Sequence, residues 1–241
     1  MSFEQLFESM YERGGIERSV YQQVLDDPKF QRWFKGSQVV DDDGIPFPCY
    51  HGTSADIKKF DHNKGDYFGV HFGTYYQAEN RMAMMDKDRS AAKDHDTYET
   101  PGSNVTPVFL KIVNPLTMPD VGSWDHPNSI AEILVSAGSE GYVQRIEDIM
   151  VAWDKTRNGD DAVEKEGTKV AMQALRAFIQ EMGHDGVRYV NEHESDNSEV
   201  GRGDEHQSAY SWIVFDSSQI KSAIANKGAY DDLDNMLERK R

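Results

Sequence analysis

Residues 49–53 read CYHGT, and sixteen residues further along, residues 69–74 read GVHFGT. Each stretch is short and largely apolar, and each places a histidine next to or shortly before a glycine. Glycine allows a backbone to approach another chain or a ligand closely. The repeated pattern therefore has two interpretations: two turns that contain histidines, or two walls of one pocket.

The size and composition of the chain describe a globular protein. It has 241 residues, 38% of them hydrophobic and 11% aromatic, which allows one sizeable core or two small ones. No apolar run is long enough to span a bilayer, and the start, MSFEQLFESMYERGG, lacks the basic region and apolar block of a signal peptide. The single cysteine excludes an internal disulfide and a multi-cysteine zinc site. We expect a cytoplasmic protein with no membrane partner.

The charge of the chain narrows the choice of partner. Its 26 basic and 42 acidic residues give a formal net charge of −16. Such a surface repels phosphates at long range, so a nucleic-acid substrate is disfavoured. A basic protein or a small molecule fits better.

Hydrophobic periodicity predicts a mixture of helices and strands. Helices are expected over residues 3–11, 21–34 with a break at Asp27-Pro28 and a stop at Gly36, 75–92, 129–137, 143–156, and 168–182 with a stop at Gly183. Strands are expected as a hairpin over residues 37–53 turning at Asp43-Gly44, from residue 105 to Asn114-Pro115, over 185–190 and over 209–215. The segments 93–104 and 191–208 are expected to be loops. The chain then divides into a helical N-terminal extension (1–36), one domain (37–225) and a polar C-terminal tail (226–241).

Three segments taken in order carry a resemblance to a known family. They are YHGT (50–53), YFGVHFGTYYQAENRM (67–82), and GHDGVRYVNEHE with YSWIVFDSSQIKSA (within 183–223). This order resembles the ADP-ribosyltransferase superfamily, most closely the branch found in polyvalent proteins of phages and mobile elements. The resemblance covers roughly residues 30–225. It implies an α+β fold with a split, mostly antiparallel sheet that clasps NAD; we expect a helical insertion in this fold and a helical N-terminal extension that lies outside the resemblance. It also implies toxin-like action in the host cytoplasm if a phage encodes the chain.

The first motif of that family is a His-Gly at the end of a strand. The resemblance implies that His51 hydrogen-bonds a ribose hydroxyl on the adenosine side of NAD. Gly52 would let the backbone approach the nicotinamide amide, because a side chain there would occupy ligand space. Thr53 offers a second hydroxyl.

The second motif resembles the Gly-x-Tyr-Phe-Ala of the poly(ADP-ribose) polymerase branch, with Gly69, His71 and Phe72 at the matching positions. His71 replaces the tyrosine and would hydrogen-bond the ribose and cover part of the nicotinamide. A histidine has less stacking area than a phenol. We therefore expect a nearby tyrosine to supply aromatic surface, with Tyr75 preferred and Tyr67 also assigned to cofactor binding.

The third motif places a glutamate at the start of the last strand, where its carboxylate stabilises the cation-like transition state. Here Ser211 occupies that position and has no charge to offer. We expect a carboxylate from the preceding loop to act instead, with Glu194 preferred over Glu192 and Glu205; Gln207 could orient a ribose without replacing the charge.

The function implied by the resemblance is transfer of ADP-ribose from NAD to a macromolecular acceptor, expected to be a protein, with release of nicotinamide. Hydrolysis of NAD is a possible side activity, and no metal is expected. The alternative is a catalytically silent module that binds NAD, another nucleotide or a protein on the same fold. A metal site built from His184, Asp185, His193, Glu194 and His206 is a weaker alternative, since their spacing matches no compact metal motif.

Overall fold

The described chain begins with two short helices that meet at a proline. A computed structural model describes residues 18–55, 57, 59–63, 67–91, 104–137, 140–192 and 210–224. Helix α2 covers Arg18–Leu25 and helix α3 covers Pro28–Phe34. The Asp27 carboxylate accepts the Lys29 N–H and caps α3. The predicted break is therefore confirmed, whereas the helix expected over residues 3–11 lies outside the described residues.

The first sheet has the strand order β1-β3-β7 and is antiparallel throughout. Its strands are β1 (Cys49–Thr53), β3 (Asn104–Leu110) and β7 (Ile220–Ser222). The hairpin predicted over residues 37–53 is wrong, because β1 pairs with β3 and only one bridge, Val40 to Pro46, joins the two arms of the Asp43-Gly44 turn. Pro46 and Pro48 have no N–H to donate, so a ladder cannot continue along that arm.

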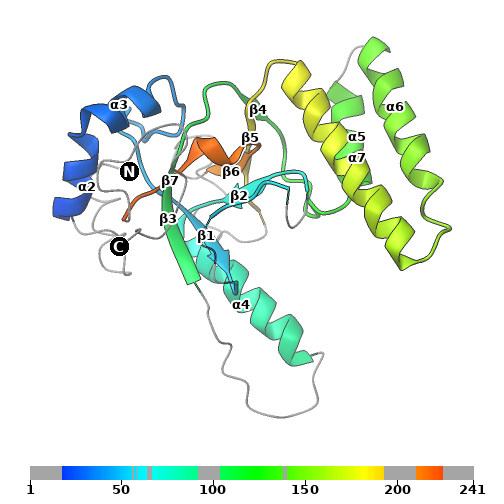
Figure 1. Ribbon diagram of the computed structural model, residues 1–241, viewed down its shortest axis with the longest axis horizontal. Helices are drawn as coiled ribbons and strands as arrows, with labels where there is room; N and C mark the ends of the chain where they lie inside the picture. The colour runs from blue at the N-terminus through cyan, green and yellow to red at the C-terminus, as the bar shows by residue number, and fades with distance from the viewer. Residues whose placement is uncertain are drawn as a thin grey trace.

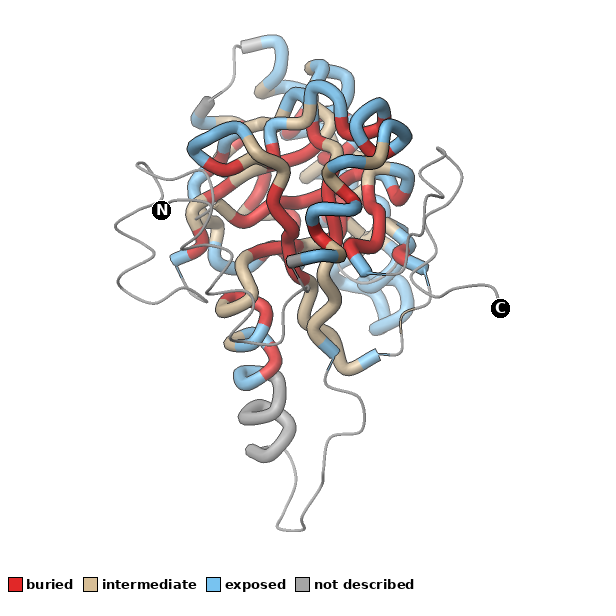
Figure 2. The backbone as a smooth tube through the Cα atoms, turned by 90° about the vertical axis from the view of Figure 1, so that its left-hand side faces the viewer, coloured by how far each residue is buried: buried red, intermediate tan, exposed pale blue. Residues whose placement is uncertain are grey.

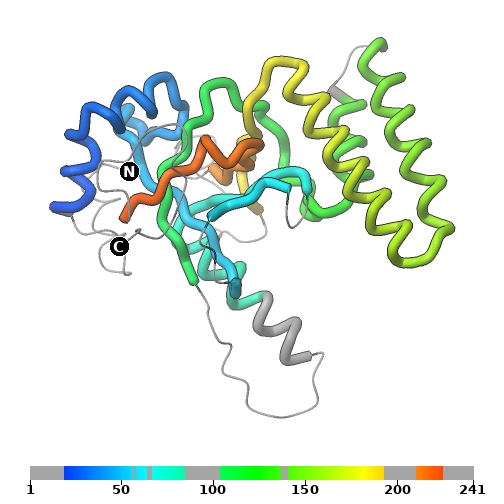
Figure 3. Tube along the Cα trace, viewed as in Figure 1, coloured from blue at the N-terminus to red at the C-terminus, as the bar shows by residue number. Residues whose placement is uncertain are grey.

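The second sheet has the strand order β2-β6-β5-β4, and only its β4–β5 pair is parallel. Its strands are β2 (Val70–Phe72), β6 (Tyr210–Val214), β5 (Gly186–Val190) and β4 (Pro115–Thr117). In Figure 3, segments far apart along the chain lie side by side here, with orange β6 between β2 and β5. One strand was predicted from residue 105 to Asn114-Pro115. Instead β3 ends at Leu110 and β4 begins at Pro115 in the other sheet, because the Asp185 carboxylate accepts the N–H groups of Val113 and Asn114 at the crossing.

Four longer helices surround the two sheets. Helix α4 (Tyr75–Ala91) packs against β1. Helices α5 (Pro127–Ala137), α6 (Glu140–Asp154) and α7 (Asp161–Glu181) form the predicted helical insertion between β4 and β5. Figure 1 shows this insertion at the opposite end of the molecule from α2 and α3, with the sheets between them. The short helix η2 (Ser217–Gln219) joins β6 to β7.

Helix α7 begins at Asp161 rather than at the predicted Thr168. Its first turns are exposed and highly charged, so they lack the apolar periodicity that the prediction used. The Asp160 carboxylate fixes the start by accepting the N–H groups of Ala162 and Val163. The predicted stop is confirmed at Gly183, where φ is +93°.

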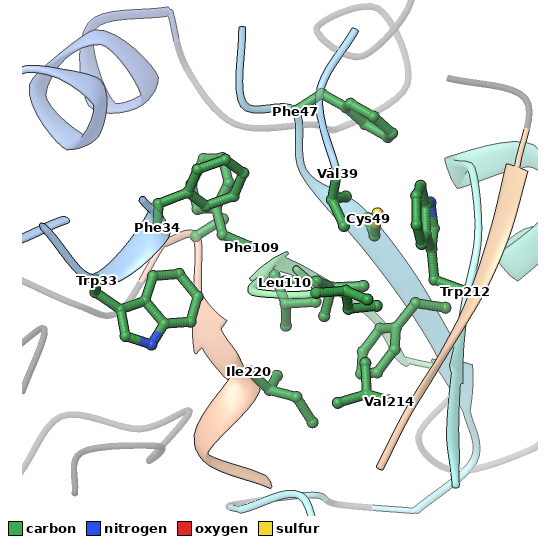
Figure 4. Close-up of a cluster of buried hydrophobic side chains, with 14 of the residues drawn as sticks. Trp33, Phe34, Val39, Phe47, Cys49, Phe109, Leu110, Trp212, Val214 and Ile220 are labelled. Carbon is green, nitrogen blue, oxygen red and sulfur yellow. The ribbon is translucent and has the colours of Figure 1, made fainter. Parts of the chain in front are cut away.

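Two hydrophobic cores lie on opposite faces of the second sheet. Trp212 and Val214 of β6 face the first core, which also contains side chains of the first sheet and of α2 and α3. In Figure 4, Trp33 and Phe34 of α3 and Phe109 of β3 lie across this core from Trp212. Ile213 faces the second core, beneath α5–α7. Figure 2 shows buried backbone running through the middle of the molecule, where the strands lie.

The architecture confirms the α+β prediction with two mostly antiparallel sheets. The helical extension is integrated into the first core, since Tyr21, Phe30 and Trp33 are all at most 4% exposed within it. Among the described helices, none has the length and apolar character needed to cross a membrane.

We predict that Asp160→Ala lowers the free energy of unfolding by about 1 kcal/mol, because two N–H groups of α7 lose their acceptor. Urea unfolding measures the change. Asp161→Ala, at the next position, removes a carboxylate that does not cap the helix and should cost clearly less. Equal losses in the two variants would contradict the start assigned to α7.

Candidate functional site

The two sheets meet at one bridge beside the cleft. Tyr50 of β1 and Gly73, just after β2, exchange both backbone hydrogen bonds, at 2.8 and 3.0 Å. Next to this bridge lies a cavity of about 900 Å³, within the range of small-molecule sites. Its lining comes from β1, β2, α4, the loop after β1, the loop between β4 and α5, and the ends of β5 and β6.

The two histidines of the repeated pattern line this same cavity. The Nδ1 atom of His51 lies 2.7 Å from the carbonyl oxygen of His71. The pattern therefore forms two walls of one pocket, and a direct hydrogen bond joins those walls.

This hydrogen bond fixes the tautomer of His51. A carbonyl oxygen can only accept, so Nδ1 carries the proton and donates it. Burial lowers the pKa of His51, which keeps the ring neutral. In a neutral ring with a protonated Nδ1, Nε2 is an acceptor. The rings of Phe60 and Phe72 flank the imidazole, with centroids at 5.2 and 5.5 Å.

His71 is held neutral more strongly. Burial, with smaller effects from His51 and Arg81, lowers the pKa of His71 to about 3, while Asp125 acts in the opposite direction. Its Nδ1 lies 3.4 Å from the Tyr189 hydroxyl. Its Nε2 is buried and has no hydrogen-bonding partner in the described part of the chain. A buried nitrogen of this kind is costly unless another molecule satisfies it.

Gly52 presents its backbone to the cleft. The backbone N–H and C=O groups of Tyr50 point towards Gly73. Along a strand these groups alternate in direction from one residue to the next. Those of His51 therefore point towards β3, and those of Gly52 point away from β3. The space on the side-chain face of Gly52 is taken by α4, because an added Cβ would overlap the carbonyl oxygen of Ala78. Packing of α4 on β1 therefore requires this glycine, so a side chain here would collide with the helix rather than occupy ligand space as expected from the sequence, and the approach of the Gly52 backbone to a ligand stays a prediction.

Ser211, at the position of the family glutamate, lies in an uncharged buried network. Its hydroxyl donates to Gln77 Oε1 at 2.9 Å and accepts from Asn191 Nδ2 at 3.3 Å. Gln77 Oε1 also accepts the Thr74 N–H at 2.8 Å. All three network residues line the cavity, yet none of them is a carboxylate.

The aromatic wall comes from residues that the sequence analysis missed. Trp124, in the loop before α5, has its ring 5.8 Å from His71 and 4.6 Å from Tyr189, and both Trp124 and Tyr189 line the cavity. Tyr75 instead packs against Tyr50 at 5.4 Å and is not among the lining residues. Tyr67 is also absent from the lining and packs against the second core, with a φ of 62°. No signal near the second motif pointed to a loop so far along the chain.

The remaining predicted residues fall into two groups. Thr53, Gly69 and Phe72 line the cavity. Glu194, with the weaker candidates Glu205 and Gln207, lies outside the described residues. Glu192 is exposed and does not line the cavity.

Charged side chains that were not predicted also line the cavity. The cations are Lys59 and Arg81, and the carboxylates are those of Asp61, Asp120 and Asp125. Arg81 projects from α4 one turn after Ala78, which packs against Gly52.

The metal alternative gains no support from the part of the chain that the structure describes. No three histidine, cysteine, aspartate or glutamate residues cluster there. His184 and Asp185 instead bond the backbone of residues 113–114. His193, Glu194 and His206 lie outside the described residues.

Comparison with known proteins gives one family match. The model of the family described as ADP-ribosyltransferase in polyvalent proteins matches residues 41–230. No curated protein matches the chain. The crystal structure of an anti-CRISPR protein aligns with 76% of this chain and 95% of its own, at 15% identity and a TM-score of 0.30.

We predict that Gly52→Ala destabilises the fold by about 2 kcal/mol or more, because α4 must move away from β1 to admit the methyl group. Thermal and urea unfolding measure the loss. Gly141→Ala is the matched control, since its Cβ would meet no atom within 4 Å and alanine favours the helix. A Gly52→Ala variant as stable as Gly141→Ala would show that α4 does not press on β1.

We predict that His71 makes the fold less stable in acid. The unfolded chain protonates this residue near pH 6.5, whereas the folded chain holds it neutral down to about pH 3. The unfolded state therefore binds more protons in this window, and the free energy of unfolding decreases as the pH is lowered, by up to about 1.4 kcal/mol per pH unit. Unfolding of wild type and His71→Gln between pH 7 and 5 measures the effect. The variant should show the shallower slope, and equal slopes would contradict the neutral state of His71.

Proposed function

Because the chain belongs to the ADP-ribosyltransferase family of polyvalent proteins, we propose that it transfers ADP-ribose from NAD to a macromolecular acceptor and releases nicotinamide. The observation that carries this proposal is the convergence of His51, Gly52 and His71 on one cavity. Each presents an uncharged hydrogen-bonding group there, and the hydroxyl and amide groups of NAD are suitable partners.

The first motif would bind two parts of NAD, a ribose on the adenosine side and the carboxamide of nicotinamide. The Nε2 acceptor of His51 takes the hydrogen of a ribose hydroxyl. The outward N–H and C=O of Gly52 pair with the carboxamide of nicotinamide, which has one acceptor and two donor hydrogens. Thr53, which follows in the same strand, supplies a further hydroxyl.

The opposite wall would cover the nicotinamide ring and its ribose. Trp124 supplies the aromatic surface that the sequence analysis assigned to Tyr75. The unsatisfied Nε2 of His71 pairs with a second ribose hydroxyl. Gly69, Phe72 and Ser211 shape this wall, while Lys59 and Arg81 attract the diphosphate.

The chemistry requires negative charge more than a strong base. When the bond between the ribose C1′ and the nicotinamide nitrogen breaks, nicotinamide leaves with both electrons and positive charge develops on the ribose. Ser211 cannot supply a compensating charge. Glu194 stays a prediction in this role, or as the residue that orients the incoming nucleophile.

The acceptor is proposed to be a protein with a basic surface. The net charge of −16 attracts such a partner and repels nucleic acid at long range. Free water as the acceptor would give NAD hydrolysis as a side reaction.

A silent NAD-binding module is the second candidate function. The uncharged network around Ser211 favours it, because the cavity would then hold the dinucleotide without stabilising the cation. Binding without turnover distinguishes this candidate from the transferase.

We predict that the purified protein releases nicotinamide from NAD and that His51→Ala lowers this rate by roughly 10²-fold or more, since a contact that positions the dinucleotide in the cleft is lost. Release is measured by chromatography, and labelled NAD with a cell lysate reveals the acceptor. His126→Ala is the control, because His126 is exposed, packs on Trp153 and does not line the cavity.

The melting temperature with and without NAD separates the two candidates. Stabilisation by NAD without nicotinamide release supports the silent module. Absence of both stabilisation and release contradicts each candidate.

A further inference from the structure

We propose that Asp125, in the loop between β4 and α5, is the carboxylate that stabilises the positively charged ribose in this cleft. The assignment rests on the proposed transfer of ADP-ribose and names the charge that Ser211 cannot provide. Of the two roles predicted for Glu194, this assignment gives stabilisation of the cation to Asp125 and keeps orientation of the nucleophile for Glu194.

Among the described residues, three carboxylates line the cavity, and only Asp120 has hydrogen bonds on both of its oxygens. Asp120 is committed to its own loop: Oδ1 accepts from Gly122 N and Trp124 Nε1, and Oδ2 accepts from Glu192 N. Asp61 accepts the Asn63 N–H with one oxygen, as Asp125 does with Ser123, but the charges that act on the pKa of His71 include Asp125 and not Asp61.

Asp125 keeps one carboxylate oxygen available. Its Oδ1 accepts the hydroxyl hydrogen of Ser123 at 2.5 Å, and its Oδ2 has no hydrogen-bonding partner in the described part of the chain. The residue is exposed and is among the residues that line the cavity.

The field of Asp125 reaches the centre of the cleft. Its negative charge is the one that raises the pKa of His71, against the opposing effect of Arg81. A positive charge developing beside His71 would therefore be stabilised by Asp125.

The loop that carries Asp125 is fixed before any ligand binds. Trp124, the preceding residue, is 7% exposed, stacks on Phe68 at 6.0 Å and bonds Asp120 through its indole nitrogen. Asp120 also ties the loop to the end of β5 through the Glu192 N–H at 2.9 Å. A carboxylate already in place stabilises a transition state without the cost of reorganising the site.

The proposed step balances as follows. The bond from C1′ to the nicotinamide nitrogen breaks, and nicotinamide departs as a neutral molecule with the bonding electrons. The ribose carries the positive charge opposite the ionised Asp125. The acceptor nucleophile then forms a bond to C1′ and loses its proton to water.

The test compares variants that separate charge from shape. Asp125→Asn keeps the size of the side chain and an oxygen for Ser123, but removes the charge. We expect nicotinamide release to fall by about 10²- to 10³-fold, while stabilisation of the protein by NAD is retained. Asp148→Asn, a carboxylate on α6 that bonds Gln144, is the matched control and should release nicotinamide like wild type.

Asp125→Glu completes the comparison, because it keeps the charge and changes the shape. If the charge matters, Asp125→Glu retains more release than Asp125→Asn; the opposite ranking overturns the assignment. Release by Asp125→Asn within about threefold of wild type also overturns it, and a simultaneous loss in Glu194→Gln would move the charge to Glu194. A wild type that releases no nicotinamide overturns the proposed function itself, and the assignment with it.

Discussion

The two hydrogen bonds between Tyr50 and Gly73 are the constraint on which the cleft depends. They join the edge of the first sheet to the edge of the second, and the strands separate beyond them. Because strand residues alternate in direction, this one bridge decides that the backbone of Gly52 faces the cleft and that of His51 faces β3. The hydrogen bond from the His51 side chain to the carbonyl oxygen of His71 is a second link between β1 and β2.

The glycines beside the histidines serve packing as much as ligand access. An added Cβ would overlap Ala78 at Gly52 and the Gln77 amide at Gly73, and both partners lie in the first turns of α4. The close approach of α4 places Gln77 against Ser211 and Arg81 beside the cavity. The placement of α4 against β1 thus determines three things together: the packing of the first motif, the contact with Ser211 of β6, and the position of the Arg81 cation at the cavity.

Features that depend on neighbouring residues could be predicted from the sequence, whereas contacts between segments far apart in the chain could not. The paired histidines, the Asp27-Pro28 break and the Gly183 stop were predictable because each signal lies within a few residues. The hairpin was wrong because a turn signal at Asp43-Gly44 says nothing about whether the next strand finds a better partner, here β3. Trp124 and Asp125 were missed because a loop between β4 and α5 reaches the second motif only through the folding of the second sheet. Ser211 was recognised as uncharged, but its bonds to Gln77 and Asn191 depend on three separate segments.

The protonation states of the cleft limit the chemistry that it can perform. With a pKa of about 3, His71 would need roughly 5 kcal/mol to hold a proton at neutral pH, so it is a poor general base. His51 is likewise neutral and has already committed its Nδ1–H to the carbonyl of His71. The histidines can therefore position hydroxyl groups but contribute neither charge nor strong proton abstraction. The proposed loss of nicotinamide from NAD is compatible with such histidines, because nicotinamide departs with the bonding electrons and that step needs no base.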